Sequence, residues 1–174
     1  MILISHRGNI NGKKPNYENK PEYIWEALRK GYHCEIDVWF IDGKFKLGHD
    51  GPTYDFPHEL VEHHYSRLWL HCKNLEAITQ FNILDNIGSK FNYFWHQKDD
   101  VTLTSQGYIW AYPGKQPLKN SIAILPEING GIEVDIGVLG KLFYVKKFLK
   151  LWVKMIYYTI LIVHNILEMV LMKI

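Results

Sequence analysis

Two carboxylates that share one face of a strand are the first feature of this sequence that could carry chemistry. Glu35 and Asp37 are two residues apart in a run, 32–40, rich in β-branched and aromatic residues. On such a strand both side chains point to the same face. Two anions this close repel each other unless a cation lies between them, so the pair indicates a site for Mg²⁺ or Ca²⁺. A solvated strand face is the alternative, but the apolar run favours a buried pair, which needs partners.

A base and a cation follow the first apolar run of the chain. Residues 1–5 predict a buried strand, and His6 and Arg7 stand at its carboxyl end, where α/β folds place their ligands. The pair Asp42-Gly43 predicts a tight hairpin that returns the chain towards the carboxylates, and this brings His49 to the same end. For His6 alone, a histidine that merely caps a strand is the alternative.

The elements that must position these residues alternate between strand and helix. Pro21 to Gly31 predicts a helix, with proline in its first turn and glycine as its stop. Asn74 predicts the N-cap of a second helix over 75–84. Further strands are expected at 68–72, 91–95, 108–112 and 121–125. The pattern indicates an α/β domain with a parallel core.

Taken together, four motifs resemble the glycerophosphodiester phosphodiesterases, within the wider group of phosphatidylinositol-phospholipase-C-like phosphodiesterases. In order they are His6-Arg7-Gly8, Glu18-Asn19, Glu35-Ile36-Asp37 and Gly48-His49-Asp50, and the resemblance covers about residues 1–75. It implies a TIM-barrel-like (β/α) barrel. Because a complete barrel takes about 250 residues and this chain has 174, we expect the barrel to be abbreviated or incomplete.

The resemblance also implies roles for individual residues. His6 and His49 would be the acid and base pair, Glu35 and Asp37 would bind the divalent ion, and Arg7 would contact the phosphodiester. The chemistry of these side chains agrees, since histidine suits proton transfer to a leaving alkoxide and a metal neutralises phosphate oxygens.

One position departs from the family pattern. The strand at 68–72 usually carries an acid as third metal ligand and, two residues later, a lysine; here Lys73 matches the lysine, but His71 replaces the acid. We expect His71 to be the third ligand and Lys73 to be a cation for the phosphate. Imidazole weakens a site for hard ions and favours Mn²⁺ or Zn²⁺. Trp110 corresponds to a tryptophan that lines the family's pocket, and a core aromatic is the alternative.

Composition bounds these interpretations. With 174 residues, 47% of them apolar and 22% charged, the chain is long enough for one globular domain. A formal net charge of +2 leaves no nucleic-acid footprint. Cys34 and Cys72 are expected to be reduced interior thiols. A zinc protein built on the nine histidines is disfavoured, because no histidine pair has ligand spacing on a helix.

The C-terminal part of the chain changes character. Six lysines and one glutamate stand among apolar residues from Lys141 onward, so we divide the chain into a barrel domain, 1–131, and a helical tail, 132–174. The tail could lie on an anionic membrane surface, span a membrane marginally or pack on the barrel, and a changed reading frame is a fourth reading. Its short apolar run favours a surface or packing helix. The opening residues lack the pattern of a signal peptide, so the expected location is cytoplasmic, with membrane association through 141–174.

The expected function is metal-dependent hydrolysis of glycerophosphodiesters or related lipid-derived phosphodiesters. Such a protein would have a small-molecule phosphodiester as its partner, and the sequence indicates no oligomeric state. A non-catalytic, degenerate barrel that binds a phosphate, a membrane or a partner protein is the rival. His71 in place of the acid favours this rival, whereas the intact set of His6, Glu35, Asp37 and His49 opposes it.

Overall fold

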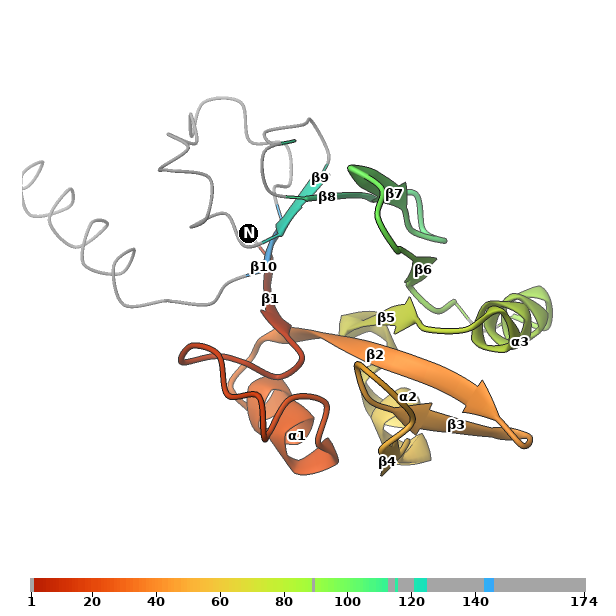
Figure 1. The fold of residues 1–174 in the computed structure, drawn as a ribbon, viewed down its shortest axis with the longest axis horizontal. Coiled ribbons are helices and arrows are strands. Elements are labelled where there is room, and N and C mark those ends of the chain that lie inside the picture. The colour runs from red at the N-terminus through yellow and green to blue at the C-terminus, as the bar shows by residue number, and fades with distance from the viewer. Residues whose placement is uncertain (1, 89, 113–114, 116–120, 125–142, 146–174) are drawn as a thin grey trace, which may run out of the picture.

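The computed structural model describes residues 2–88, 90–112, 115, 121–124 and 143–145 (Figure 1). Within them, ten strands form one sheet and three α-helices accompany it. The strands are β1 (Ile2–His6), β2 (His33–Ile41), β3 (Lys44–Leu47), β4 (Tyr54–Asp55), β5 (Leu68–Cys72), β6 (Tyr93–Trp95), β7 (Val101–Leu103), β8 (Ile109–Ala111), β9 (Ser121–Ile124) and β10 (Phe143–Val145). The helices are α1 (Pro21–Arg29), α2 (His58–His64), the 3₁₀ turn η1 (Tyr65–Arg67) and α3 (Leu75–Asn86).

Strand β2 organises the sheet because it is nine residues long and has partners along both edges. On one edge, its first half pairs with β1 in parallel and its second half pairs with β3 antiparallel. On the other edge β5 runs parallel to it, and β6 runs parallel to β5. Beyond β1 the order continues β10, β9, β8 in parallel, and β7 is antiparallel to β8.

The expectation of a TIM-barrel-like (β/α) barrel is wrong. The sheet is mixed, and in the described part of the chain no ladder joins β6 to β7, so no barrel is closed. Helices do not alternate with strands either: β6, β7 and β8 follow one another across five-residue connections. A parallel crossover needs a dozen or more residues, so this stretch turns back as a hairpin. Thr102 and Ser105 hydrogen-bond to carbonyl groups at β6, but they do not form a ladder.

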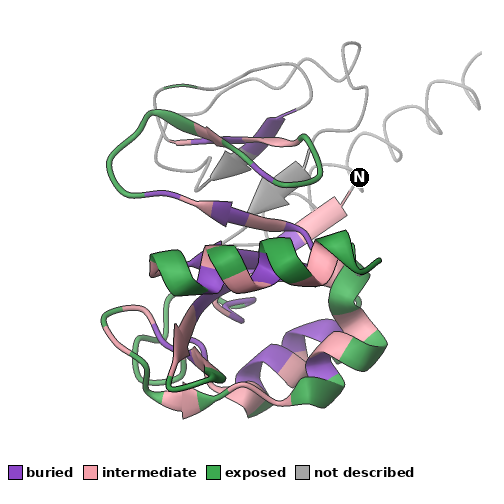
Figure 2. Cartoon of the chain, turned by 90° about the vertical axis from the view of Figure 1, so that its right-hand side faces the viewer, coloured by how far each residue is buried: buried purple, intermediate pink, exposed green. Residues whose placement is uncertain are grey.

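The sheet curls, and all three helices lie on its outer face (Figure 1). This outer face carries the larger core, in which Ile36, Val38 and Leu70 pack with Phe81 of α3. Figure 2 shows the same division on α3, whose buried residues face the sheet and whose exposed residues face away. The inner face holds a second, aromatic cluster, made of Ile4, Trp69, Phe94, Trp110 and Ile122.

Several local predictions from the sequence are confirmed. Asp42 and Gly43 both have positive φ, 51° and 75°, as a hairpin that matches strand twist requires. The Asn74 side chain accepts a hydrogen bond from the backbone of Ala77 and so caps α3. Cys34 and Cys72 are free and buried.

Most of the expected C-terminal tail, 132–174, lies outside the described residues, as do its membrane and packing alternatives. The part that is described, β10, is a strand between β1 and β9. Among the described helices, none has the length and apolar character needed to cross a bilayer.

The outer core yields a prediction about stability. Phe81 is 1% exposed and stacks on Phe45 with ring centroids 4.5 Å apart. We expect Phe81→Ala to lower the free energy of unfolding by about 3–5 kcal/mol, because it leaves a cavity. Ile83→Ala, on the exposed side of the same helix, should change it by less than about 0.5 kcal/mol. Urea denaturation measures both, and a similar small change in the two variants would contradict the assigned core.

Candidate functional site

Glu35, Asp37 and His71, called here the donor trio, meet on the inner face of the sheet. Strand register explains why: Asp37 of β2 stands directly opposite His71 of β5, and Glu35 lies one inward position earlier on β2. Each of the three residues offers one ligand atom, and these atoms lie within 4.8 Å of one another. The structure therefore brings together the three residues that the sequence predicted as metal ligands.

Asp37 is the most enclosed member of the trio, with 0% exposure. Its Oδ2 atom accepts a hydrogen bond from the Asn19 side chain at 2.8 Å and lies 2.8 Å from Arg7 Nε. Its Oδ1 atom lies 2.9 Å from His71 Nδ1 and 3.7 Å from Lys73 Nζ. Burial opposes ionisation, but the adjacent His71 and the charge of Arg7 outweigh it and hold the pKa of Asp37 below its usual range.

Glu35 responds to the same surroundings in the opposite direction. Burial, reinforced by the negative charge of Asp37, raises the pKa of Glu35 to about 8. Its Oε2 atom lies 3.6 Å from His6 Nε2, and its Oε1 atom lies 3.7 Å from His71 Nδ1. Two buried carboxylates this close cannot both be ionised without more positive charge nearby.

The hydrogen bonding of His71 determines which of its nitrogens faces the carboxylates. Its Nε2 atom lies 3.1 Å from the backbone carbonyl oxygen of His96, and a carbonyl oxygen can only accept. Nε2 therefore carries a proton, and in the neutral ring Nδ1 presents a lone pair to Asp37 and Glu35. Histidine ligands of metals are commonly held in this way through the second ring nitrogen.

These residues fit a divalent ion. Asp37 Oδ1 is buried, and its neighbours within the described residues are His71 Nδ1 at 2.9 Å and Lys73 Nζ at 3.7 Å; in the neutral His71 ring, Nδ1 meets it with a lone pair. Adjacent ligands of an octahedral ion at about 2.1 Å lie about 3 Å apart, close to the 2.9 Å between Oδ1 and Nδ1. Two carboxylates suit Mg²⁺ or Ca²⁺, and the imidazole adds affinity for Mn²⁺ or Zn²⁺.

The two predicted catalytic histidines occupy different surroundings. His6 ends β1 beside Glu35, and burial together with the charge of Arg7 lowers its pKa to about 3. The His49 side chain is 40% exposed, and its Nδ1 lies 2.6 Å from Asp50 Oδ1. The loop that carries His49 is tied to β2, since Gly48 donates its N–H to the carbonyl of Asp37. Gly48 has φ 147°, and a Cβ there would lie 2.0 Å from the Gly51 carbonyl oxygen, so only glycine fits.

Arg7 and Lys73 supply positive charge from two sides. Arg7 Nη1 pairs with Glu18 at 3.1 Å, and Arg7 Nε faces Asp37, so this cation links the first loop to the donor trio. Lys73 follows β5 and, as predicted, lies on the same face as His71.

Trp110 lies next to the site but is only 2% exposed. Its ring stacks on Phe94 with centroids 4.5 Å apart, and Phe94 in turn stacks on His71 at 5.0 Å. Of the two interpretations made from the sequence, this burial fits the core aromatic better than the pocket lining.

Three residues of this region were missed or undervalued in the sequence. Asn19 is 1% exposed and clamps Asp37, accepting from its N–H at 3.0 Å as well as donating to Oδ2. The polar run 96–100 after the strand expected at 91–95 favours a solvated loop for His96 over a further contact of the site, yet His96 is buried. Tyr112 stacks on His96. For His96 and Tyr112, the sequence did hold a signal. Side chains alternate between the two faces of a strand, and each of these residues stands two positions after an aromatic residue that faces inward.

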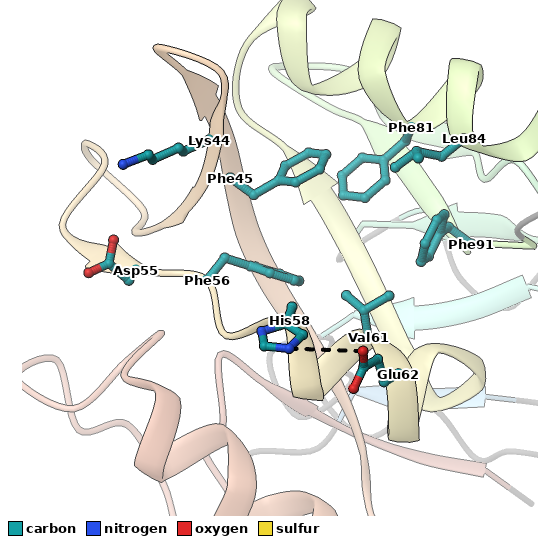
Figure 3. A pocket seen from close by; sticks show the side chains of 10 residues that line it. All are labelled: Lys44, Phe45, Asp55, Phe56, His58, Val61, Glu62, Phe81, Leu84 and Phe91. Carbon is teal, nitrogen blue, oxygen red and sulfur yellow. Dashed lines mark ion pairs between the residues drawn. The ribbon is translucent and has the colours of Figure 1, made fainter.

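A separate hollow lies on the outer face of the sheet (Figure 3). Its volume is about 460 Å³, and it is lined mainly by the rings of Phe45, Phe56, Phe81 and Phe91. The polar residues on it come from β3, β4 and α2, and no member of the donor trio lines it. We therefore assign the chemistry to the inner face.

Comparison of the chain with protein-family models, with curated proteins and with solved structures gave no match. The geometry described above therefore carries the functional interpretation.

The donor trio predicts the effect of removing one carboxylate. Glu35→Gln should weaken the binding of Mn²⁺ at least about 10-fold. Mutation of a residue that only hydrogen-bonds to a metal ligand already lowers metal affinity by about this factor. Glu22→Gln, on the exposed side of α1, should leave it unchanged. Isothermal titration calorimetry measures both, and equal affinity in the two variants would remove Glu35 from the site.

The clamp on Asp37 predicts a second effect. Asn19 has φ 63°, so Asn19→Gly keeps the backbone relaxed while it removes both side-chain hydrogen bonds. We expect the free energy of unfolding to fall by about 1–3 kcal/mol, since the Asp37 N–H and Oδ2 each lose a hydrogen-bond partner. We also expect the affinity for Mn²⁺ to fall about 10-fold or more.

Asn16→Gly, in the exposed part of the same loop, is the matched control. If it changes stability and Mn²⁺ binding as much as Asn19→Gly does, the clamp is not the cause.

Proposed function

We propose that this protein is a metal-dependent phosphodiester hydrolase that acts on glycerophosphodiesters or related lipid-derived phosphodiesters. The observation that carries the proposal is the convergence of two buried carboxylates and the Nδ1 lone pair of His71 beside two histidines and two cations. The resemblance of the motifs to the glycerophosphodiester phosphodiesterases supplies the substrate class.

In this proposal, Glu35, Asp37 and His71 hold the divalent ion. The bound ion would act as a Lewis acid on the phosphoryl group and neutralise its charge. Asn19 and the carbonyl of His96 support the donors from behind, because they occupy Asp37 Oδ2 and His71 Nε2 and leave Oδ1 and Nδ1 facing each other.

Lys73 and Arg7 provide positive charge for the phosphate oxygens. Two nitrogens of Arg7 already face Glu18 and Asp37, and Nη2 makes no hydrogen bond or ion pair in the part of the chain that the structure describes. Arg7 would therefore both fix the site and offer Nη2 to the phosphodiester, while Lys73 would act as a point charge.

His6 and His49 would move the protons. One imidazole takes the proton from the attacking oxygen, and the other gives a proton to the leaving oxygen as its bond to phosphorus breaks. The contact of His49 Nδ1 with Asp50 orients the ring and leaves Nε2 for the substrate. His6 is held between Glu35 and the start of the first loop.

One observation favours the rival, a non-catalytic protein that binds phosphate or a partner. If His71 carries protons on both nitrogens, the 2.9 Å contact with Asp37 is a simple ion pair, and the site needs no metal. Such a site would still present Arg7 and Lys73 to an anion. Metal binding separates the two functions.

The experiment is hydrolysis of bis(p-nitrophenyl) phosphate by the purified chain after chelation, with Mg²⁺, Ca²⁺, Mn²⁺ or Zn²⁺ added back. We expect turnover that depends on the ion, and we expect His49→Ala to lower it at least about 100-fold, the low end for loss of a general acid or base. A rate highest with Mn²⁺ or Zn²⁺ would reflect His71 as a ligand.

His58→Ala is the matched control, since His58 is an exposed histidine of α2 that also contacts neighbouring acids. It should keep the full rate. A folded chain that turns over with none of the ions would overturn the hydrolase and favour the binding protein.

A further inference from the structure

The inner face carries a second layer of side chains above the aromatic cluster. On β6, Phe94 points inward opposite His71, so the next inward position is His96. On β8, Trp110 points inward and stacks on Phe94, so the next inward position is Tyr112. Both later positions lie towards the carboxyl ends of their strands, where Lys73 and the donor trio also lie.

His96 and Tyr112 meet in this upper layer. Their rings stack with centroids 3.8 Å apart and an interplanar angle of 16°. The loops that carry them are joined as well, because His96 Nε2 lies 2.6 Å from the carbonyl oxygen of Asp99 and Tyr112 donates its N–H to the carbonyl of Asp100. A salt bridge of 2.8 Å between Lys115 and Asp100 adds to the connection. The pair is therefore held in place across the gap between β6 and β8.

His96 also contacts the donor trio. Its carbonyl oxygen receives the Nε2 proton of His71, and the two imidazole centroids are 6.3 Å apart. One residue thus fixes the orientation of His71 through its backbone and the position of Tyr112 through its ring.

Tyr112 lies beside the charged centre of the site, because its ring stacks on His96 and the carbonyl of His96 accepts from His71. Burial, with the negative charge of Glu35, raises the pKa of its hydroxyl, so the hydroxyl keeps its proton as a donor. Charges of Arg7 and Asp37 act on the same hydroxyl. Tyr112 is half-buried, and within the described residues its hydroxyl makes no hydrogen bond, so it can donate to a ligand.

We propose that Tyr112 is a substrate-binding residue whose hydroxyl donates a hydrogen bond to a phosphate oxygen, and that His96 is a positioning residue that couples Tyr112 to His71. This inference rests on the proposed function, because the phosphate is that of the proposed substrate. Tyr112 lies one inward position beyond Trp110. It would therefore line the pocket in the way that the resemblance implied for Trp110.

The first test uses Tyr112→Phe, which keeps the stacked ring and removes only the hydroxyl. With the Mn²⁺-loaded chain, we expect affinity for inorganic phosphate to fall about 5-fold or more and kcat/KM for bis(p-nitrophenyl) phosphate to fall about 10-fold, as loss of one hydrogen bond to a charged group predicts. Affinity for Mn²⁺ should stay unchanged. Tyr65→Phe, on the exposed turn η1, is the control for all three measurements.

The second test separates positioning from simple packing. His96→Ala removes the ring that holds Tyr112, and we expect it to weaken phosphate binding as much as Tyr112→Phe does. His96→Phe restores a flat ring at this place and should recover phosphate binding to within about 3-fold, because stacking is retained. No recovery, in a variant with unchanged thermal unfolding, would overturn the positioning role.

Phosphate binding distinguishes a failure of this inference from a failure of the proposed function. A chain that binds Mn²⁺ and phosphate through Tyr112 but hydrolyses no diester would contradict the hydrolase and support the role of Tyr112. Equal phosphate affinity in the wild-type chain and in Tyr112→Phe would overturn the inference, whether or not the chain is a hydrolase.

Discussion

The charge of one fully buried carboxylate, that of Asp37, is the constraint on which the rest of the site depends. An unpaired charge at this depth would destabilise the fold by several kcal/mol, so four side chains surround it: Arg7, Asn19, His71 and Lys73. Arg7 and Asn19 come from the loop after β1, His71 comes from β5, and Lys73 directly follows β5. The same contacts that satisfy the charge therefore fix the first loop against the sheet and aim His71 at Glu35.

The strand that carries Asp37 is also the strand on which the sheet is built. Strand β2 pairs with β1, β3 and β5, and its outward residues anchor the larger core while its inward residues form the site. A closed barrel is not required for this arrangement. Strands β1, β2, β5 and β6 place His6, the donor trio and His96 together, and the hairpin of β7 and β8 adds Tyr112. The chemistry depends on register between neighbours rather than on closure of the sheet.

The electrostatics explain why the proposed hydrolase and its rival share one geometry. With both carboxylates ionised, the donor trio and Glu18 would carry more negative charge than Arg7 and Lys73 offset, and burial together with this excess raises the pKa of Glu35. A proton on His71 or a divalent ion would each restore the balance, and the carbonyl of His96 holds the ring in the same orientation for both. Whether His71 Nδ1 binds a proton or a metal ion is therefore the physical difference between a structural ion pair and a catalytic site.

Local patterns in the sequence determined helices α1 and α3, the hairpin at Asp42-Gly43, the common face of Glu35 and Asp37, and the common face of His71 and Lys73, since each depends on spacing within one element. They also brought forward Glu35, Asp37, His6, Arg7 and His49, and the resemblance added His71 as the third ligand. What only the tertiary structure decided was how elements pair. The sheet stays open because β7 and β8 form a hairpin at the place where a (β/α) barrel has a crossover helix, and Trp110 is buried with its ring stacked on Phe94. Asn19, His96 and Tyr112 acquire their roles through contacts with residues 16 to 25 positions away in the chain, and no local pattern specifies such contacts.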